Sequence, residues 1–403
     1  MSESATMDQL NIPDHIPPEL VVDLNLYDLV RGGEDAQIAW QRFRHHGPIV
    51  WSPHNGGHWV PTRSDDIKTL FRDTVNLSAT DGTAVPPPAG VHLLPTNTDP
   101  PELEEYRRAV MPFFSPNAIN AVSQDIRQRA IAMIEELQPL GQCEFVDDFA
   151  QKMPVLVFLS FMGLPAEDRQ YLLEITNNFV RSPDMAVKMK AFGDVFAYLE
   201  ERIVERRTAP AGDVISRLLE ATFNGRVYTH DEVLKTCVTL LLAGLDTVAA
   251  LLSFVAAWLA REPAQRAAIR ARGSDLAPVS EELLRRFAVA NLGRRVARDF
   301  ELHGVRLKAG DRILLSTVLH NLDAELFPEP MKIDFDRGRI AHLTFGSGGH
   351  ACLGAYLART ELGIFLEEWL RRIPDFEIAP GNEAKSSSGG IDAVDRLPLR
   401  WAV

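Results

Sequence analysis

The chain has 403 residues, of which 46% are hydrophobic and 24% charged, and its net charge is −13. This composition can bury a large core, which excludes a disordered chain as the default. The acidic balance argues against nucleic acid or an anionic membrane as the main partner. Because the first residues are acids and prolines instead of a basic start followed by an apolar run, we expect a cytoplasmic protein without a signal peptide or membrane anchor.

The N-terminal third predicts short strands and then helices. Residues 47–61 have the pattern of two short strands around the turn Asn55-Gly56-Gly57. A helix is expected to start at about residue 99, with Asp99 able to cap it and a proline at its first position. Apolar residues recur at helical spacing from about 118 to 222, so this region is expected to be mostly helix.

A long apolar helix is predicted from the capping box of Thr229 and Glu232 to about Arg261. Residues 237–260 are apolar enough to suggest a membrane span, but Asp246 lies near the middle, where it would cost about 2.5 to 3.5 kcal/mol in a bilayer. We therefore favour the central helix of a large core. Short alternating runs after residue 299 predict a small sheet, and residues 353–372 predict another helix.

The order of these elements predicts a mainly α protein with a minor β region. No Gly/Ser tract, charge block or repeat divides the chain, so residues 1–403 are expected to form a single domain.

Cys352 is placed for chemistry, because it lies between a glycine-rich loop and the start of a helix. Backbone N–H groups and the positive helix end favour a thiolate, and the glycines let the backbone approach a flat cofactor. Such a thiolate can bind haem iron and favour O–O cleavage. The alternative is a buried structural cysteine, which is the role that we expect for Cys143 and Cys237.

Four motifs carry a family resemblance. The run from Phe345 to Gly354 matches the FxxGxxxCxG signature of cytochromes P450, with Cys352 at the cysteine position. The family's other signatures follow its order and spacing at Ala243–Thr247, Glu282–Arg285 and Asn321–Asp323, the last leading to Phe335–Asp336. The chain thus resembles a bacterial cytochrome P450 over essentially its whole length, nearest to the camphor hydroxylase subgroup. The resemblance implies a haem b group buried between the long central helix and the Cys loop at 345–354, with Cys352 as the iron ligand and O2 as co-substrate.

Asp246 and Thr247 place a carboxylate and a hydroxyl inside an apolar helix, where unpaired burial would cost about 1 to 3 kcal/mol each. An internal polar network, or a hydroxyl bonded back to the helix, is the structural alternative. The resemblance implies instead that the pair delivers protons during oxygen activation. It also implies that Arg181 is the ion-pair partner of Asp246.

The resemblance assigns the haem-binding residues as well. Arg107, Arg294 and His350 match the partners of the haem propionates, a role that suits the planar fork of arginine. Phe345 and Gly346 open the loop that would lie against the haem. His350 could otherwise be an iron ligand itself, but ligation by the nearby Cys352 argues against that.

Glu282 and Arg285 lie three positions apart on a predicted helix, where an exposed pair would contribute only about 0.2 to 0.5 kcal/mol. The resemblance implies a buried pair that stabilises the fold on the proximal side of the haem and takes no part in catalysis.

The residues that match the family's substrate pocket are mostly apolar, namely Val91, His92, Thr96, Thr239, Leu242, Ala243, Val289 and Ile391. Val91 replaces the tyrosine that binds the camphor ketone, and losing that donor removes the selection it provides. His92, or another donor on the same loop, could restore the contact. We expect a monoterpenoid or an ionone-like norisoprenoid other than camphor.

The resemblance also implies partners. The chain has no flavin or NAD motif, so an oxygenase of this kind would take electrons from a [2Fe-2S] ferredoxin and its NAD(P)H-dependent reductase, docking on a local basic patch that includes Arg107. A peroxygenase or dehydratase on the same fold, and a haem sensor without catalysis, are the alternatives. The acid and alcohol pair Asp246-Thr247 favours oxygen activation.

Overall fold

The computed structural model describes residues 10–31, 34–87, 90–181, 185–338 and 340–403. Its helices are α1 Ala36–Gln41, α2 Ser64–Leu70, α3 Glu102–Val110, α4 Pro116–Leu137, α5 Lys152–Met162, α6 Arg169–Arg181, α7 Met185–Thr208, α8 Val214–Leu219, α9 His230–Leu245, α10 Thr247–Arg261, α11 Pro263–Ala271, α12 Ala277–Arg286, α13 Thr317–Asn321 and α14 Ala355–Arg372.

The strands are short and scattered along the chain. They are β1 Ile49–Ser52, β2 His58–Pro61, β3 Leu77–Ser78, β4 Gln142–Glu144, β5 Thr222–Phe223, β6 Arg226–Val227, β7 Asn291–Val296, β8 Phe300–Leu302, β9 Val305–Leu307, β10 Arg312–Ser316, β11 Phe376–Ile378, β12 Lys385–Ser387, β13 Ala393–Arg396 and β14 Pro398–Trp401. A helical body with a small sheet region confirms the predicted fold class.

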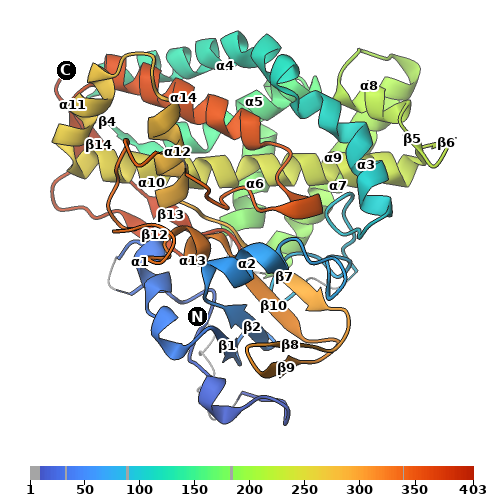
Figure 1. Cartoon of the computed structure of the whole chain (residues 1–403). Helices are drawn as coiled ribbons and strands as arrows, with labels where there is room; N and C mark the ends of the chain where they lie inside the picture. The colour runs from blue at the N-terminus through green and yellow to red at the C-terminus, as the bar shows by residue number, and fades with distance from the viewer. Residues whose placement is uncertain (1–9, 32–33, 88–89, 182–184, 339) are drawn as a thin grey trace.

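The largest sheet joins distant parts of the chain in the order β1-β2-β10-β7-β3, at the foot of the molecule in Figure 1. Strands β1 and β2 form the predicted hairpin, with Trp51 opposite Trp59. The turn requires glycine, because Gly57 has φ +81 and a Cβ there would lie 2.7 Å from the Trp51 ring. Strand β10 then pairs parallel to β2 and antiparallel to β7.

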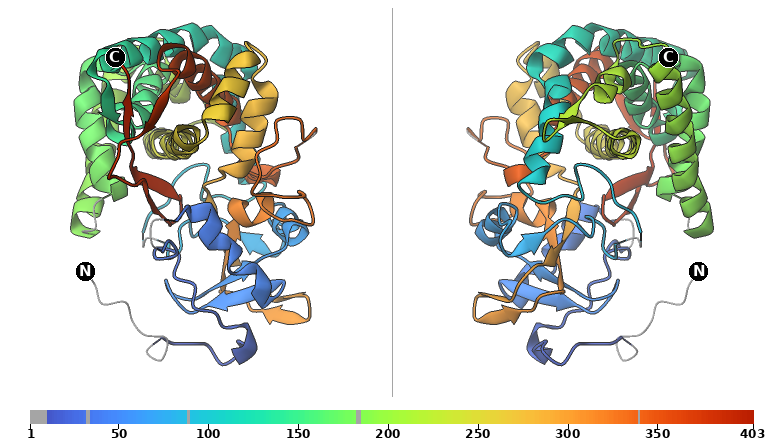
Figure 2. Two further views of the ribbon diagram at one scale, coloured as in Figure 1. Left: turned by 90° about the vertical axis from the view of Figure 1, so that its left-hand side faces the viewer. Right: turned by 90° about the vertical axis from the view of Figure 1, so that its right-hand side faces the viewer.

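Helices α9 and α10 run through the centre of the helical body, and Figure 2 shows them end-on with other helices around them. The predicted capping box is present, since the Thr229 Oγ1 accepts from the Glu232 N–H at 3.2 Å and the Glu232 carboxylate accepts from the Thr229 N–H at 2.7 Å. The span from His230 to Arg261 is long and apolar enough to cross a membrane, but 72% of its most apolar window is buried inside the fold. A core helix accounts for this pattern.

Two predicted helix boundaries are wrong. The long helix is interrupted at Asp246, which has φ −103 and ψ −35 and separates α9 from α10. Helix α3 begins at Glu102 after Pro101, and the Asp99 side chain does not cap it. Asp99 Oδ1 instead accepts from the Ala79 N–H at 2.8 Å, which ties the residues after β3 to the start of α3.

Candidate functional site

The Cys loop is a tight turn that only glycine permits at two positions. Gly346 and Gly348 have φ +66 and +76, and a Cβ on Gly348 would lie 3.0 Å from the Arg72 Cα. The Cys352 N–H donates to the Phe345 carbonyl at 2.8 Å, which closes the loop just before α14. This turn aims Cys352 out of the loop at a helix start, as the glycine pattern predicts.

Neighbouring elements hold the loop in place. The Arg72 Nε donates to the Ser347 Oγ at 2.6 Å, and the Arg107 Nη2 donates to the Ala351 carbonyl at 2.8 Å. Leu103 is fully buried on α3, and a Cβ on Gly349 would approach its Cδ2 to 3.0 Å. Helix α3 and the residues just after α2 therefore hold the Cys loop in place.

Cys352 keeps solvent-accessible surface, although protein atoms surround its thiol closely. Burial raises the pKa of Cys352, whereas a hydrogen bond from the Gly354 backbone and the charges of Arg107 and Arg359 lower it. Its accessible surface leaves the thiol open to a ligand. A cation bound to the sulfur would offset the effect of burial and favour the thiolate, so the site suits a thiolate-bound metal.

Three predicted haem-binding residues come together from distant parts of the chain. Arg294, on β7, is 5% exposed and donates to the neighbouring Gly293 carbonyl at 2.8 Å. Burial lowers the pKa of Arg294 to about 10, although the charge of Asp99 raises it. The pKa of His350 falls to about 4, first through burial and then through the charge of Arg294, with a smaller effect of Arg107.

Within the described part of the chain, no carboxylate lies within ion-pairing distance of Arg294. A buried guanidinium normally has an anionic partner, because an unpaired buried charge is costly. Two propionate groups would supply that partner at Arg294, and also meet Arg107 and His350. The cluster therefore fits the carboxylate edge of a haem.

Helix α9 ends at the predicted acid and alcohol pair. The Thr247 Oγ1 donates to the Ala243 carbonyl at 3.2 Å, which is the back-bonded geometry of the structural alternative. Thr236, Thr239 and Ser253 bond back in the same way without breaking the helix. Back-bonding alone therefore does not explain the break at Asp246. Arg181 ends helix α6, and its side chain lies outside the described residues.

The predicted pocket residues differ in how they are placed. Ala243 keeps exposed surface in the middle of the core helix, and Leu242 is half-buried. Thr239 is nearly buried, and its hydroxyl donates to the Lys235 carbonyl at 2.9 Å. Val91 and Thr96 are half-buried, and His92 is exposed.

Ala290 lies opposite the predicted pocket residue Ile391, and the sequence did not indicate this. A bridge pairs Ala290 with Ile391, and both side chains are partly exposed, whereas Val289 is buried in the main core. Neighbouring side chains in an extended segment point to opposite faces, so Ala290 shares the face of Ile391 and Val289 lies on the other. No local pattern marks this register, because burial in β7, the strand that follows, does not alternate strictly.

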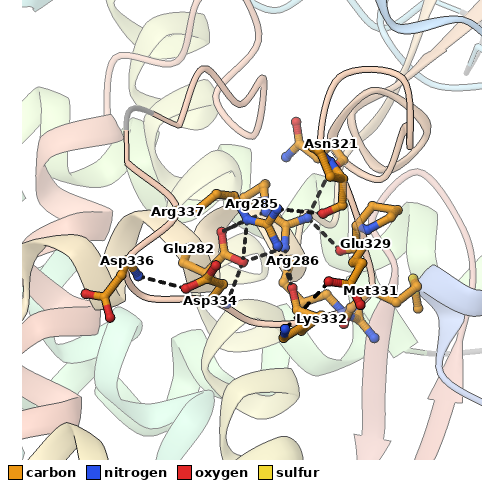
Figure 3. A network of polar contacts seen from close by, with 12 residues as sticks. Glu282, Arg285, Arg286, Asn321, Glu329, Met331, Lys332, Asp334, Asp336 and Arg337 are labelled. Carbon is orange, nitrogen blue, oxygen red and sulfur yellow. Dashed lines mark hydrogen bonds and ion pairs between the residues drawn. The ribbon is translucent and has the colours of Figure 1, made fainter.

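Glu282 and Arg285 form a fully buried ion pair, both with 0% side-chain exposure. The Arg285 Nε and Nη2 donate to the two Glu282 oxygens at 2.8 and 2.7 Å, and Figure 3 shows Arg337 approaching the same carboxylate. The Arg285 Nη1 also donates to the Asn321 carbonyl at 3.1 Å. Because the Asn321 side chain accepts from the Leu343 N–H at 2.7 Å, the network reaches the residues that lead into the Cys loop.

Comparisons with known proteins agree with this geometry. Residues 276–392 match the family model described as Cytochrome P450. The probable cytochrome P450 127A1 of Sinorhizobium fredii is 33% identical, over 97% of each chain. Vitamin D3 dihydroxylase of Streptomyces griseolus is 30% identical, over 75% of this chain and 76% of its own. The crystal structures of CYP101J2 and CYP101C1 have TM-scores of 0.91 and 0.90 at 34% and 35% identity, each covering 98% of this chain and 100% of the other.

An accessible cysteine in a glycine-rich loop, near the buried Arg294 that lacks a carboxylate partner among the described residues, fits a haem-binding fold. The chain belongs to the cytochrome P450 family, as the resemblance implied. It is a monooxygenase of that family, which binds haem b and uses O2 as co-substrate.

Proposed function

We propose that this protein hydroxylates a small terpenoid other than camphor, with electrons from a [2Fe-2S] ferredoxin and its NAD(P)H-dependent reductase. The observation that carries the substrate class is that the predicted pocket residues Ala243 and Ile391, and Ala290 paired with Ile391, are apolar and keep accessible surface. An apolar wall selects by shape more than by hydrogen bonding. The whole chain acts as one domain in the cytoplasm, and the ferredoxin docks at the basic patch around Arg107.

Different residues of the site would bind different parts of haem b. Cys352 binds the iron as a thiolate, Arg107, Arg294 and His350 bind the propionates, and the loop at Phe345 and Gly346 lies against the ring. The haem, when bound, supplies the redox chemistry that activates O2.

Asp246 and Thr247 supply protons in this proposal. The Thr247 Oγ1 is a donor held at the break between α9 and α10, one turn from the accessible Ala243. In turnover the hydroxyl would turn from the Ala243 carbonyl to donate to the reacting oxygen, and the Asp246 carboxylate would pass protons to it from water. A hydrogen-peroxide-driven peroxygenase would instead form product from peroxide without NADH.

Replacing Thr247 by alanine is expected to leave haem and substrate binding intact and to divert consumed O2 to hydrogen peroxide. General acid catalysis typically contributes about 10² to 10⁴ in rate, so the yield of hydroxylated product per NADH should fall at least about tenfold. Asp246→Asn should mainly slow turnover. Thr236→Ala is the matched control, because that hydroxyl also bonds back, to the Glu232 carbonyl at 2.7 Å on the preceding helix α9. Equal coupling in Thr247→Ala and the parent would exclude the relay.

Ionone-like substrates are expected to bind more tightly than camphor. Val91 has no hydrogen-bond donor for the camphor ketone, and His92 is exposed. Binding should therefore depend on apolar fit more than on a hydrogen bond to a ketone. The spin-state shift of the haem on titration with camphor, a monoterpene hydrocarbon and β-ionone measures this directly. Tight camphor binding with well-coupled hydroxylation would overturn the substrate class. If a His92→Ala variant then lost camphor binding, His92 would be the replacement donor.

A further inference from the structure

Asp392 is a buried acid that gathers three parts of the chain. Its side chain is 0% exposed, and it directly follows the predicted pocket residue Ile391 in the sequence. The carboxylate accepts from the Trp40 Nε1 at 2.9 Å, from the Asn291 Nδ2 at 3.2 Å and from the Gly389 N–H at 3.2 Å. These donors come from α1, β7 and the turn after β12, which lie far apart in the sequence.

No cation compensates this carboxylate among the residues that the structure describes. The charge that acts on it is that of Asp35, which is itself paired with Arg286 at 3.0 Å. Burial, reinforced by Asp35, raises the pKa of Asp392 to about 7 against the three hydrogen bonds that lower it. Burying a carboxylate with neutral donors alone costs free energy of folding. The backbone around Asp392 indicates which segments its hydrogen bonds hold together.

The same junction is closed by backbone hydrogen bonds. The Asp392 N–H donates to the Val289 carbonyl at 2.9 Å, and the Asn291 N–H donates to the Gly390 carbonyl at 2.8 Å. Between them lies the bridge of Ala290 and Ile391. Because neighbouring side chains alternate, Asp392 lies behind this bridge while Ile391 and Ala290 face the accessible side.

We propose that Asp392 is a positioning residue for the substrate, which fixes Ile391 against Ala290 and so sets which carbon of an apolar terpenoid faces the reacting centre. This proposal rests on the proposed function. A substrate without a polar handle is oriented by the shape of the wall alone. A displaced wall therefore changes orientation, and a misplacement of about 1 Å is enough to alter reactivity.

The test compares Asp392→Ala and Asp392→Asn with Asp395→Asn, a matched control on the same hairpin whose acid is exposed and accepts from the Ser387 Oγ at 2.8 Å. Three readouts are taken on the haem-loaded protein: hydrogen exchange at the amides of residues 291 and 392, the dissociation constant from the spin-state shift, and the distribution of hydroxylated products. We expect Asp392→Ala to raise exchange and the dissociation constant about tenfold and to yield several products, because the donors of Trp40 and Asn291 lose their acceptor.

Asp392→Asn should fall between the parent and Asp392→Ala, since its amide oxygen still accepts from Trp40. The control should match the parent in all three readouts. Unchanged products and dissociation constant in Asp392→Ala, at a temperature where it remains folded, would overturn the proposal even if its melting temperature fell. A parent protein that hydroxylates no terpenoid would contradict the proposed function instead, and unchanged exchange in Asp392→Ala would then contradict the positioning role separately.

Discussion

Replacing Cys352 by serine is expected to abolish the strongly red-shifted Soret band of the reduced protein under carbon monoxide, and hydroxylation with it. A serine oxygen ionises far less readily than a thiol and donates less electron density to iron. Arg107 and Arg359, whose charges favour the thiolate, cannot lower the pKa of an alcohol enough to compensate. Product formation should fall at least about 10²-fold.

The matched control for this variant is Cys143→Ala. Cys143 is 8% exposed on β4, and burial raises the pKa of its thiol, so it remains a neutral core residue. Its replacement should keep the red-shifted band with a modest loss of stability. A Cys352→Ser protein that kept the band would disprove the ligand assignment, and loss of the band in Cys143→Ala would mean that the spectrum reports folding alone.

Replacing Arg285 by alanine is expected to destabilise the protein by about 3 to 5 kcal/mol, because Glu282 would remain buried with Arg337 as its remaining ion-pair partner. The loss should also loosen Asn321 and the segment that leads into the Cys loop, so the variant should retain haem poorly. Thermal unfolding and the haem content of the purified protein measure the two effects.

An exposed pair at the same spacing provides the comparison. Arg108 and Glu105 pair at 2.8 Å on α3, with the arginine side chain 70% exposed. Arg108→Ala should cost no more than about 1 kcal/mol, as surface pairs do. If Arg285→Ala yields too little soluble protein, Arg285→Lys keeps the charge and still removes the bidentate contact. Melting temperatures for the Arg285 variants equal to that of Arg108→Ala would disprove the structural role.

The sequence alone determined the features that depend on neighbouring residues. Positive φ at Gly346 and Gly348 follows from a glycine-rich run before a helix. The capping box depends only on Thr229 and Glu232, which lie three positions apart. The hairpin turn at Asn55 is local in the same way. The motif around Cys352 and the three further family motifs were therefore enough to predict the family and the cofactor, and helical periodicity predicted the mainly α fold.

Only the tertiary structure decided what depends on residues far apart in the chain. It brought Arg107 of α3, Arg294 of β7 and His350 together, and it left Arg294 buried without a carboxylate among the described residues. It also interrupted the central helix at Asp246, where local helical periodicity continues unbroken.

The register of the pocket wall was likewise beyond the sequence. Ala290, not its neighbour Val289, pairs with Ile391, because the bridge to the C-terminal segment fixes which side chain faces inward. Asp392 gave no signal of its own, since its role comes from Trp40 and Asn291, more than a hundred positions away in each case. Burial and hydrogen bonding across such separations are properties of the folded chain, and no local pattern encodes them.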